Sequence, residues 1–305
     1  MRVPFVDAHV HLWDLARAGY DWLRPPFRDD VPGGSPESIA STYLLDDYLA
    51  EIAGWNLAGF VHVDAGAGAD QARAETLWLQ EIADARGRPN GIVAFADLRA
   101  PEVEALLAFH DTHANARGIR QIVNWHADPA RSYHPRDMVD DPAWHRGYAL
   151  LGKYGLSFDL QAYPGQFEPL AALIERHDDV PVVVDHLGMP IGTDGDGWDT
   201  WRRGLAGLAA LPHVAIKVSG AGFIHRDWSA DSVRAAVLET IALFGTERVL
   251  IASNFPTDRM FATMDHTLGA YETILADFSE DERRDLWGRN ANRIYRLGLD
   301  LGSAA

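Results

Sequence analysis

Short runs of apolar, mostly β-branched residues recur along the chain at fairly even intervals. The clearest of them reads PVVVDH and spans residues 181–186. Runs this apolar are typical of parallel strands that are buried on both faces. We therefore expect strands over residues 3–8, 58–64, 91–97, 117–123, 156–161, 181–186, 213–218 and 248–253.

The stretches between these runs show the apolar spacing of amphipathic helices, as in Val103, Leu106 and Leu107. Strands that alternate with helices along the whole chain indicate a parallel sheet covered by helices. Eight such units favour a closed (β/α)8 barrel, or TIM barrel, over an open doubly wound sheet. Even the first and last runs are apolar, so neither resembles an edge strand. We predict an α/β fold with one TIM-barrel domain over residues 1–305.

One connection is too long for an ordinary loop. Residues 14–44 are rich in proline, glycine and tryptophan and contain no run that resembles a strand of the barrel. We expect this segment to form a loop that covers the mouth of the barrel.

Composition narrows the choice of partners. The 305 residues carry 27 basic and 44 acidic side chains, and the net charge of −17 repels nucleic acids and anionic membranes. The absence of cysteine excludes disulfides and thiolate metal sites and suits a reducing cytoplasm. No apolar run approaches the roughly 18 residues that span a bilayer, and the first residues lack a signal-peptide pattern. We expect a cytoplasmic protein that acts on a small molecule, with homo-oligomer formation left open.

Histidines mark the candidate chemistry. The working residues of a TIM barrel lie at the C-terminal ends of its strands. Asp7, His9 and His11 alternate along the first run, so that a regular strand would point all three toward the barrel axis. His186 ends the sixth run. Three such imidazoles can bind a divalent ion or orient a substrate carbonyl, although histidines can also be satisfied by hydrogen bonds inside the barrel.

Five motifs follow in an order that carries a family resemblance. They are VDAHVHLWD at residues 6–14, VDHLG at 184–188, KVSG at 217–220, ASNFP at 252–256 and GRNA at 288–291. As a set they resemble the amidohydrolase superfamily, in particular its lactonase-like branch of sugar-lactone and pyrone-dicarboxylate lactone hydrolases. The resemblance implies a TIM barrel with a site at its mouth and hydrolysis of a cyclic ester to a hydroxy acid. It also implies a zinc-like ion in many members, whereas some members work without metal.

The chain departs from the family at the eighth strand. The usual aspartate, which ligates metal and serves as general base, matches Asn254. An amide cannot accept a proton at neutral pH, and its carbonyl is a poorer zinc ligand than a carboxylate. A fifth-strand histidine is also missing. The metal therefore stays open: His9, His11 and His186 can hold a divalent ion, zinc by preference, or act without one.

Some other group must then take a proton from the attacking water. Asp258 stands four residues beyond Asn254, where the eighth loop can fold back over the site. Asp64 ends the second run and shares a face with His62, as a base or as an orienting partner. We favour Asp258 as the base and expect Asn254 to position groups by hydrogen bonding. Both aspartates can instead be helix N-caps.

Cations and aromatic residues complete the candidate site. Arg120 and Lys217 lie in apolar runs, where an unpaired charge is costly, so each needs a ligand or a buried partner. Either can stabilise an oxyanion, and an ion pair of Lys217 with Asp159 is the structural alternative. Met189 stands where pyrone-dicarboxylate hydrolases present an arginine, which argues against a doubly anionic substrate. We expect mouth aromatics to bind substrate, and these are Trp13, Trp22, Trp125 and Phe223.

Together these features predict a hydrolase that opens a small cyclic ester, most simply a lactone. Two alternatives stay open. A decarboxylase or isomerase would use the same histidines on another substrate, and a ligand-binding pseudoenzyme would explain why Asn254 replaces the usual base.

Overall fold

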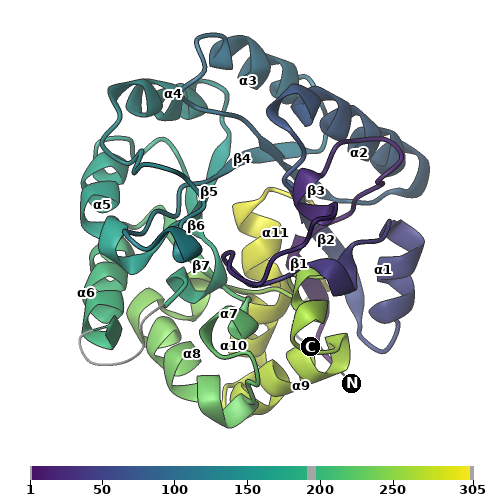
Figure 1. The fold of residues 1–305 in the computed structure, drawn as a ribbon. Helices are drawn as coiled ribbons and strands as arrows, with labels where there is room; N and C mark the ends of the chain where they lie inside the picture. Colours follow the sequence, from purple (N-terminus) through teal and green to yellow (C-terminus); the bar gives the residue numbers. More distant parts are fainter. Residues whose placement is uncertain (1, 191–196, 303–305) are drawn as a thin grey trace.

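Eight parallel strands form one sheet whose order follows the sequence (Figure 1). The computed structural model describes residues 2–190 and 197–302. The strands are β1 (Phe5–Val10), β2 (Leu57–Val63), β3 (Gly91–Phe95), β4 (Ala116–Ile122), β5 (Ser157–Gln161), β6 (Val182–Val184), β7 (Val214–Val218) and β8 (Val249–Ile251). Each begins and ends within two residues of its expected range. The eight expected strands are therefore confirmed.

The sheet closes where the segment after β8 meets β1. The backbone N–H of His11 donates to the carbonyl of Phe255 at 2.8 Å. The Asp7 carboxylate adds a second link, since its Oδ1 accepts from the backbone N–H of Ser253 at 2.9 Å. An open sheet would leave these edge groups without strand partners. The predicted TIM barrel is confirmed, and the open sheet is excluded.

Helices surround the barrel, and Figure 1 shows them as an outer ring. They are α1 (Leu45–Glu51), α2 (Ala72–Arg86), α3 (Val103–Asp111), α4 (Pro142–Lys153), α5 (Phe167–Glu175), α6 (Gly197–Ala209), α7 (Ala221–Ile224), α8 (Ala230–Phe244), α9 (Met264–Ile274), α10 (Glu280–Arg284) and α11 (Asn290–Ile294). A π-helical turn over Asp285–Arg289 joins the last two. Among the described residues no helix combines the length and the apolar character needed to cross a membrane.

Apolar side chains fill the interior of the barrel as well as the layer between barrel and helices. Val6, Val63 and Val183 pack inside the barrel with Ala291 of α11 and the adjoining Tyr295. Figure 1 shows α11 behind the centre of the sheet. The C-terminal helix therefore closes the end of the barrel opposite the mouth and leaves the mouth for chemistry.

A register shift in β1 aims its polar side chains. Ala8 packs inside the barrel, and Asp7 points outward, where its Oδ2 accepts from the hydroxyl of Tyr48 on α1 at 2.9 Å. The pairing with β2 then shifts between Asp7 and Val10, and this bulge lets His9 point inward directly after Ala8. The expectation that Asp7 faces the barrel axis was wrong, because strict alternation does not hold across a bulge.

The long connection after β1 crosses the mouth of the barrel, as the purple segment in Figure 1 shows. Its two ends are clamped together, since Trp13 and Tyr43 exchange two backbone hydrogen bonds of 2.9 Å. Two short 3-10 turns, Asp21–Leu23 and Glu37–Ile39, lie between them. We call residues 14–44 the mouth loop.

Candidate active site

A cavity of about 500 Å³ opens at the C-terminal ends of the strands, beneath the mouth loop. We call it the inner cavity. His11, Arg120, His186 and Asn254, which come from the ends of four different strands, line its base. The residues above them include Trp22, Phe27, Val31, Tyr133 and Phe223. The volume suits a small-molecule ligand.

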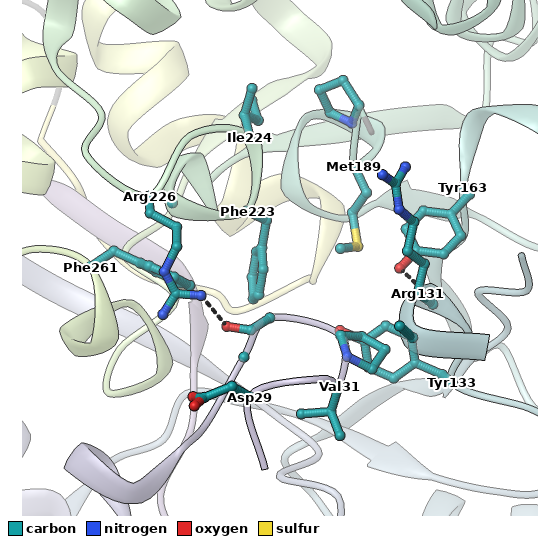
Figure 2. Close-up of a pocket in the computed structure, with 16 residues that line it drawn as sticks. Asp29, Val31, Arg131, Tyr133, Tyr163, Met189, Phe223, Ile224, Arg226 and Phe261 are labelled. Atoms are coloured by element: carbon teal, nitrogen blue, oxygen red, sulfur yellow. Dashed lines mark hydrogen bonds between the residues drawn. The ribbon is translucent and has the colours of Figure 1, made fainter. Parts of the chain in front are cut away.

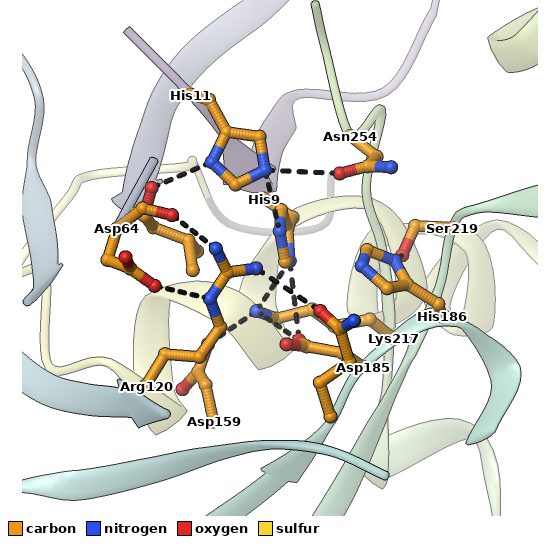
Figure 3. A network of polar contacts seen from close by, with 12 residues as sticks. His9, His11, Asp64, Arg120, Asp159, Asp185, His186, Lys217, Ser219 and Asn254 are labelled. Atoms are coloured by element: carbon orange, nitrogen blue, oxygen red, sulfur yellow. Dashed lines mark hydrogen bonds and ion pairs between the residues drawn. The ribbon is translucent and has the colours of Figure 1, made fainter. Parts of the chain in front are cut away.

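The three predicted histidines converge at this base (Figure 3). The Nε2 atoms of His9 and His11 lie 3.2 Å apart, and the ring centres of His9 and His186 lie 4.7 Å apart. All three side chains are buried. Burial lowers the pKa of His186 to about 4 and holds those of His9 and His11 well below the usual range, because a charged ring would lose its hydration. The imidazoles are therefore neutral at pH 7.

A tight turn after β6 places His186. Both His186 and Leu187 adopt left-handed backbone conformations, with φ of 53° and 55°. The turn packs against Gly220, where an added Cβ would lie 2.8 Å from the Cβ of His186. Ser219 then fixes the ring, since its Oγ lies 2.9 Å from Nδ1. Glycine at 220 is thus a steric requirement for bringing the histidine to the site.

Hydrogen bonds also orient His11 and Asn254. Nδ1 of His11 lies 2.8 Å from the Val63 carbonyl and donates to it, which leaves Nε2 without a proton. The amide nitrogen of Asn254 donates to Oδ1 of Asp258 at 2.7 Å, so that its carbonyl oxygen lies 3.3 Å from Nε2 of His11. Two acceptors thus face each other with no proton between them.

The expected base, Asp258, lies behind this amide and does not line the inner cavity. Its side chain is buried, and burial raises its pKa to about 7. Asn254 stands between Asp258 and the cavity, because the 3-10 turn that follows β8 folds the carboxylate onto the amide. The geometry therefore makes Asp258 a positioning residue for Asn254 and does not place its carboxylate in the cavity as a base.

A buried group of charges lies directly below the histidines. Nζ of Lys217 lies 2.5 Å from Asp159 Oδ2, 2.9 Å from Asp185 Oδ1 and 3.1 Å from Nδ1 of His9. The hydroxyl of Tyr295 donates to Asp159 at 2.8 Å. We call Lys217, Asp159, Asp185 and Tyr295 the interior cluster.

The interior cluster changes two sequence-based assignments. Lys217 is fully buried and does not line the inner cavity, so it pairs with carboxylates and does not contact an oxyanion there. The ion pair with Asp159 that was the structural alternative is present. The sequence analysis did not assign Asp185, although it directly precedes His186 in the same motif. Its Oδ1 lies 3.3 Å from Nδ1 of His9 and orients that ring.

Arg120 lines the inner cavity and is held by Asp64. Its Nε donates to Asp64 Oδ2 at 2.6 Å, and a terminal nitrogen donates to the Asp64 backbone carbonyl. Asp64 is thus committed to the guanidinium and is not placed to act as a base. His62 lies behind the wall, where its Nε2 is 3.2 Å from the Leu12 carbonyl, and it does not line the cavity.

The four expected mouth aromatics separate into two groups. Trp22 and Phe223 line the inner cavity, as predicted. Trp13 is fully buried behind Trp22, with ring centres 5.5 Å apart, and its indole donates to the Ser41 carbonyl. Trp125 is not among the lining residues. The expected substrate contacts of Trp13 and Trp125 are therefore not supported.

Ligand atoms of His9, Asp185 and His186 lie within 4.8 Å of one another and form one candidate metal group. The ammonium of Lys217 lies 2.9 Å from Asp185 Oδ1, however, and its positive charge opposes a cation at that oxygen. This group therefore fits a metal poorly while Lys217 is charged.

A second group fits a divalent cation better. Nε2 of His11 is unprotonated and faces both Nε2 of His9 and Oδ1 of Asn254. The 3.2 Å between the two nitrogens suits two ligands that each lie about 2.0–2.1 Å from one zinc ion. The amide oxygen supplies a neutral third ligand in place of the usual carboxylate.

Comparison with known proteins identifies the family of this chain. Residues 6–297 match the amidohydrolase family. The chain is 39% identical to the uncharacterized protein y4mH of Sinorhizobium fredii, over 97% of this chain and 99% of that one. It is 31% identical to the L-fucono-1,5-lactonase of Burkholderia multivorans, over 96% of each chain.

A solved structure shows the same fold with metal. The crystal structure of an amidohydrolase from Burkholderia multivorans with bound zinc superposes with a TM-score of 0.79 at 28% identity, covering 96% of this chain and 99% of that one. The family match over residues 6–297 and the 31% identity over 96% of each chain show that this chain belongs to the amidohydrolase family.

Proposed function

We propose that this protein hydrolyses a small lactone in the inner cavity. The observation that carries the proposal is that His11, His186 and the Arg120 guanidinium line the base of one cavity. Nε2 of the buried His9 lies 3.2 Å from that of His11 and adds a third neutral imidazole to this group. The 31% identity to a protein named as a lactonase supports the same reaction class. A lactone is neutral and compact, which suits a cavity whose base carries one cation.

Arg120 stabilises the oxygen of the lactone carbonyl. Asp64 occupies Nε and one terminal nitrogen, while the other terminal nitrogen makes a long 3.4 Å contact to Gln161. That nitrogen therefore has hydrogen-bonding capacity for a ligand. A fixed cation placed where negative charge develops lowers the barrier to acyl transfer.

His186 accepts the proton of the attacking water. When Nδ1 donates its hydrogen to Ser219, the lone pair of Nε2 is available, and the lowered pKa keeps the ring neutral. The water oxygen bonds to the carbonyl carbon, and its proton passes to Nε2. The bond from that carbon to the ring oxygen then breaks, and the ring oxygen takes the proton to give a hydroxy acid.

A divalent metal fits the same arrangement. Nε2 of His9, Nε2 of His11 and Oδ1 of Asn254 would hold it, and a bound zinc ion lowers the pKa of water and polarises carbonyl groups. Asp185 and Val63 orient the two imidazoles from their far sides.

The test is turnover of a panel of sugar and aromatic lactones, followed by proton release. We expect the wild type to open at least one lactone and His186→Asn to lose most of that activity. His113→Asn, which alters a histidine beyond the end of α3, is the matched control. The proposal fails if no lactone is opened, or if His186→Asn equals the wild type on every substrate. Release of carbon dioxide would identify a decarboxylase instead.

A further inference from the structure

A second cavity of about 480 Å³ adjoins the inner cavity (Figure 2). We call it the outer cavity. Both cavities are lined by Val31, Pro32, Gly34, Tyr133 and Phe223. A ligand released from the inner cavity therefore meets the outer cavity directly across this shared wall.

Phe223 forms the centre of the wall. Its ring centre lies 5.7 Å from that of His186 on one side and 5.4 Å from that of Phe261 on another. The mouth loop fits closely over it, because a Cβ added at Gly33 would lie 3.0 Å from the Phe223 ring. Glycine at this position lets the loop touch the aromatic wall, so the reaction centre and the outer cavity are one side chain apart.

The outer cavity carries positive charge in a strongly acidic protein. Arg131 and Arg226 line it from different loops, on opposite sides of Phe223 in Figure 2, and Asp29 is the carboxylate among its lining residues. Arg226 donates to the Gly33 backbone carbonyl at 3.2 Å. Arg131 lies 3.7 Å from the exposed Asp128. The pair of Arg131 with Asp128 is exposed and long, and no carboxylate of the described residues pairs with Arg226.

Tyr133 presents a hydrogen-bond donor on the wall that the two cavities share. The hydroxyls of Tyr20, Tyr43 and Tyr163 donate to protein acceptors, whereas that of Tyr133 has no such partner among the described residues. Unlike Tyr148, its oxygen is not sealed from solvent. Burial raises the pKa of Tyr133 to about 12, so the phenol stays protonated and can donate. A half-buried hydroxyl that opens onto two cavities and is not engaged by the described residues is free to donate to a ligand that enters them.

We propose that the outer cavity binds the carboxylate of the hydroxy acid that forms in the inner cavity. This inference rests on the proposed function, because ring opening converts a neutral ester into an anion. The carboxylate forms beside Arg120 in the inner cavity, and Arg131 and Arg226 present two further cations to it across the shared wall. Tyr133 donates a hydrogen bond from the shared wall.

The test compares two ligands that differ in charge. Galactonate carries a carboxylate, and galactitol of the same carbon chain carries a neutral hydroxymethyl group. We expect galactonate to bind the wild type about tenfold more tightly in calorimetric titrations, as hydrogen bonds to a charged group require. The double variant Arg131→Gln/Arg226→Gln should lose this preference, and Tyr133→Phe should lose part of it.

Arg136→Gln is the matched control, because Arg136 is exposed, pairs with Asp141 at 3.2 Å and lines neither cavity. Equal binding of the two ligands by the wild type would overturn the inference, as would a preference that survives in the double variant. Lactone turnover is measured separately. Charge-selective binding without turnover would defeat the proposed function alone, whereas turnover without selectivity would defeat this inference alone.

Discussion

The cations of the interior cluster and of the outer cavity differ in burial and in how closely carboxylates pair with them. Lys217 is fully buried and lies within 3 Å of carboxylate oxygens of both Asp159 and Asp185. Arg131 and Arg226 are exposed, and the nearest carboxylate of Arg131 is 3.7 Å away. An unpaired charge is costly where water is excluded and cheap where water remains. The interior charges are therefore fixed before any ligand arrives, whereas the outer ones remain available to bind one.

The sharpest test of this difference removes the buried cation. Lys217→Met leaves Asp159 and Asp185 buried without their partner, so we expect the free energy of unfolding to fall by about 3–5 kcal/mol. Lys153→Met removes a cation from an exposed pair with Glu104 at 2.6 Å and should cost about 0–1 kcal/mol. Denaturant titration measures both. Similar losses in the two variants would show that burial does not set the difference.

The next largest effect concerns the cation that lines the inner cavity. Arg120→Gln should lower kcat/KM for a lactone by about 10²–10³, because a fixed donor to the developing oxyanion is lost. Arg86→Gln, which removes an exposed partner of Asp46, is the control and should leave kcat/KM unchanged. A kcat/KM for Arg120→Gln equal to that of the wild type would place Arg120 with the purely structural charges of the interior cluster.

The comparison also explains how much of the fold the sequence could predict. The apolar runs determine the strands directly, since a strand buried on both faces tolerates few polar residues. The bulge near His9 left no sequence signal, and it reversed the expected direction of Asp7. Backbone register depends on pairing with β2, which an alternation pattern alone does not contain.

The sequence predicted those site residues whose place in the fold follows from their position at the end of a strand. His9, His11 and His186 converge because the ends of parallel strands meet at one end of a barrel. Lys217 was expected to stabilise an oxyanion because it is a charge in an apolar run, and Asp258 was expected to take a proton from water because its loop can fold back over the site. In the structure Lys217 pairs with Asp159, and Asp258 accepts a hydrogen bond from Asn254. Which partner a side chain binds depends on distances in space, which the sequence alone does not contain.

Asp258 offers a smaller and more specific test. Asp258→Asn removes the acceptor that fixes the amide of Asn254 and allows Nδ2 to turn toward His11. We expect zinc affinity to fall by about 10–100-fold, as for other residues that orient metal ligands. Equilibrium dialysis against a chelator measures bound zinc without reference to activity.

The control for this test is Asp265→Asn, whose carboxylate accepts from Trp55 far from the inner cavity. If both variants retain zinc as the wild type does, the orientation of Asn254 does not depend on Asp258. If Asp258→Asn alone releases zinc, a buried carboxylate outside the cavity governs the cation within it.

The smallest effect is expected where the mouth loop meets the barrel wall. Glu75 of α2 is buried, and its Oε1 accepts from the hydroxyl of Tyr20 at 3.0 Å. Burial, followed by the nearby charge of Asp64, raises the pKa of Glu75 to about 8. The folded state therefore binds a proton that the unfolded chain releases near pH 4.5. This stabilisation is complete below that pH and is lost as the pH rises through 8.

Glu75→Gln keeps a neutral group at this junction at every pH. Between pH 5 and 7 the wild type should lose up to about 1 kcal/mol of unfolding free energy per pH unit relative to the variant. Denaturant titration at several pH values measures this slope, and Glu81→Gln on the same helix is the exposed control. Parallel pH profiles for wild type and Glu75→Gln would mean that Glu75 is ionised in the folded protein. Water would then reach the barrel wall beside Arg120, as it reaches the arginines of the outer cavity. Charges that remain available to a ligand would in that case also occur inside the barrel.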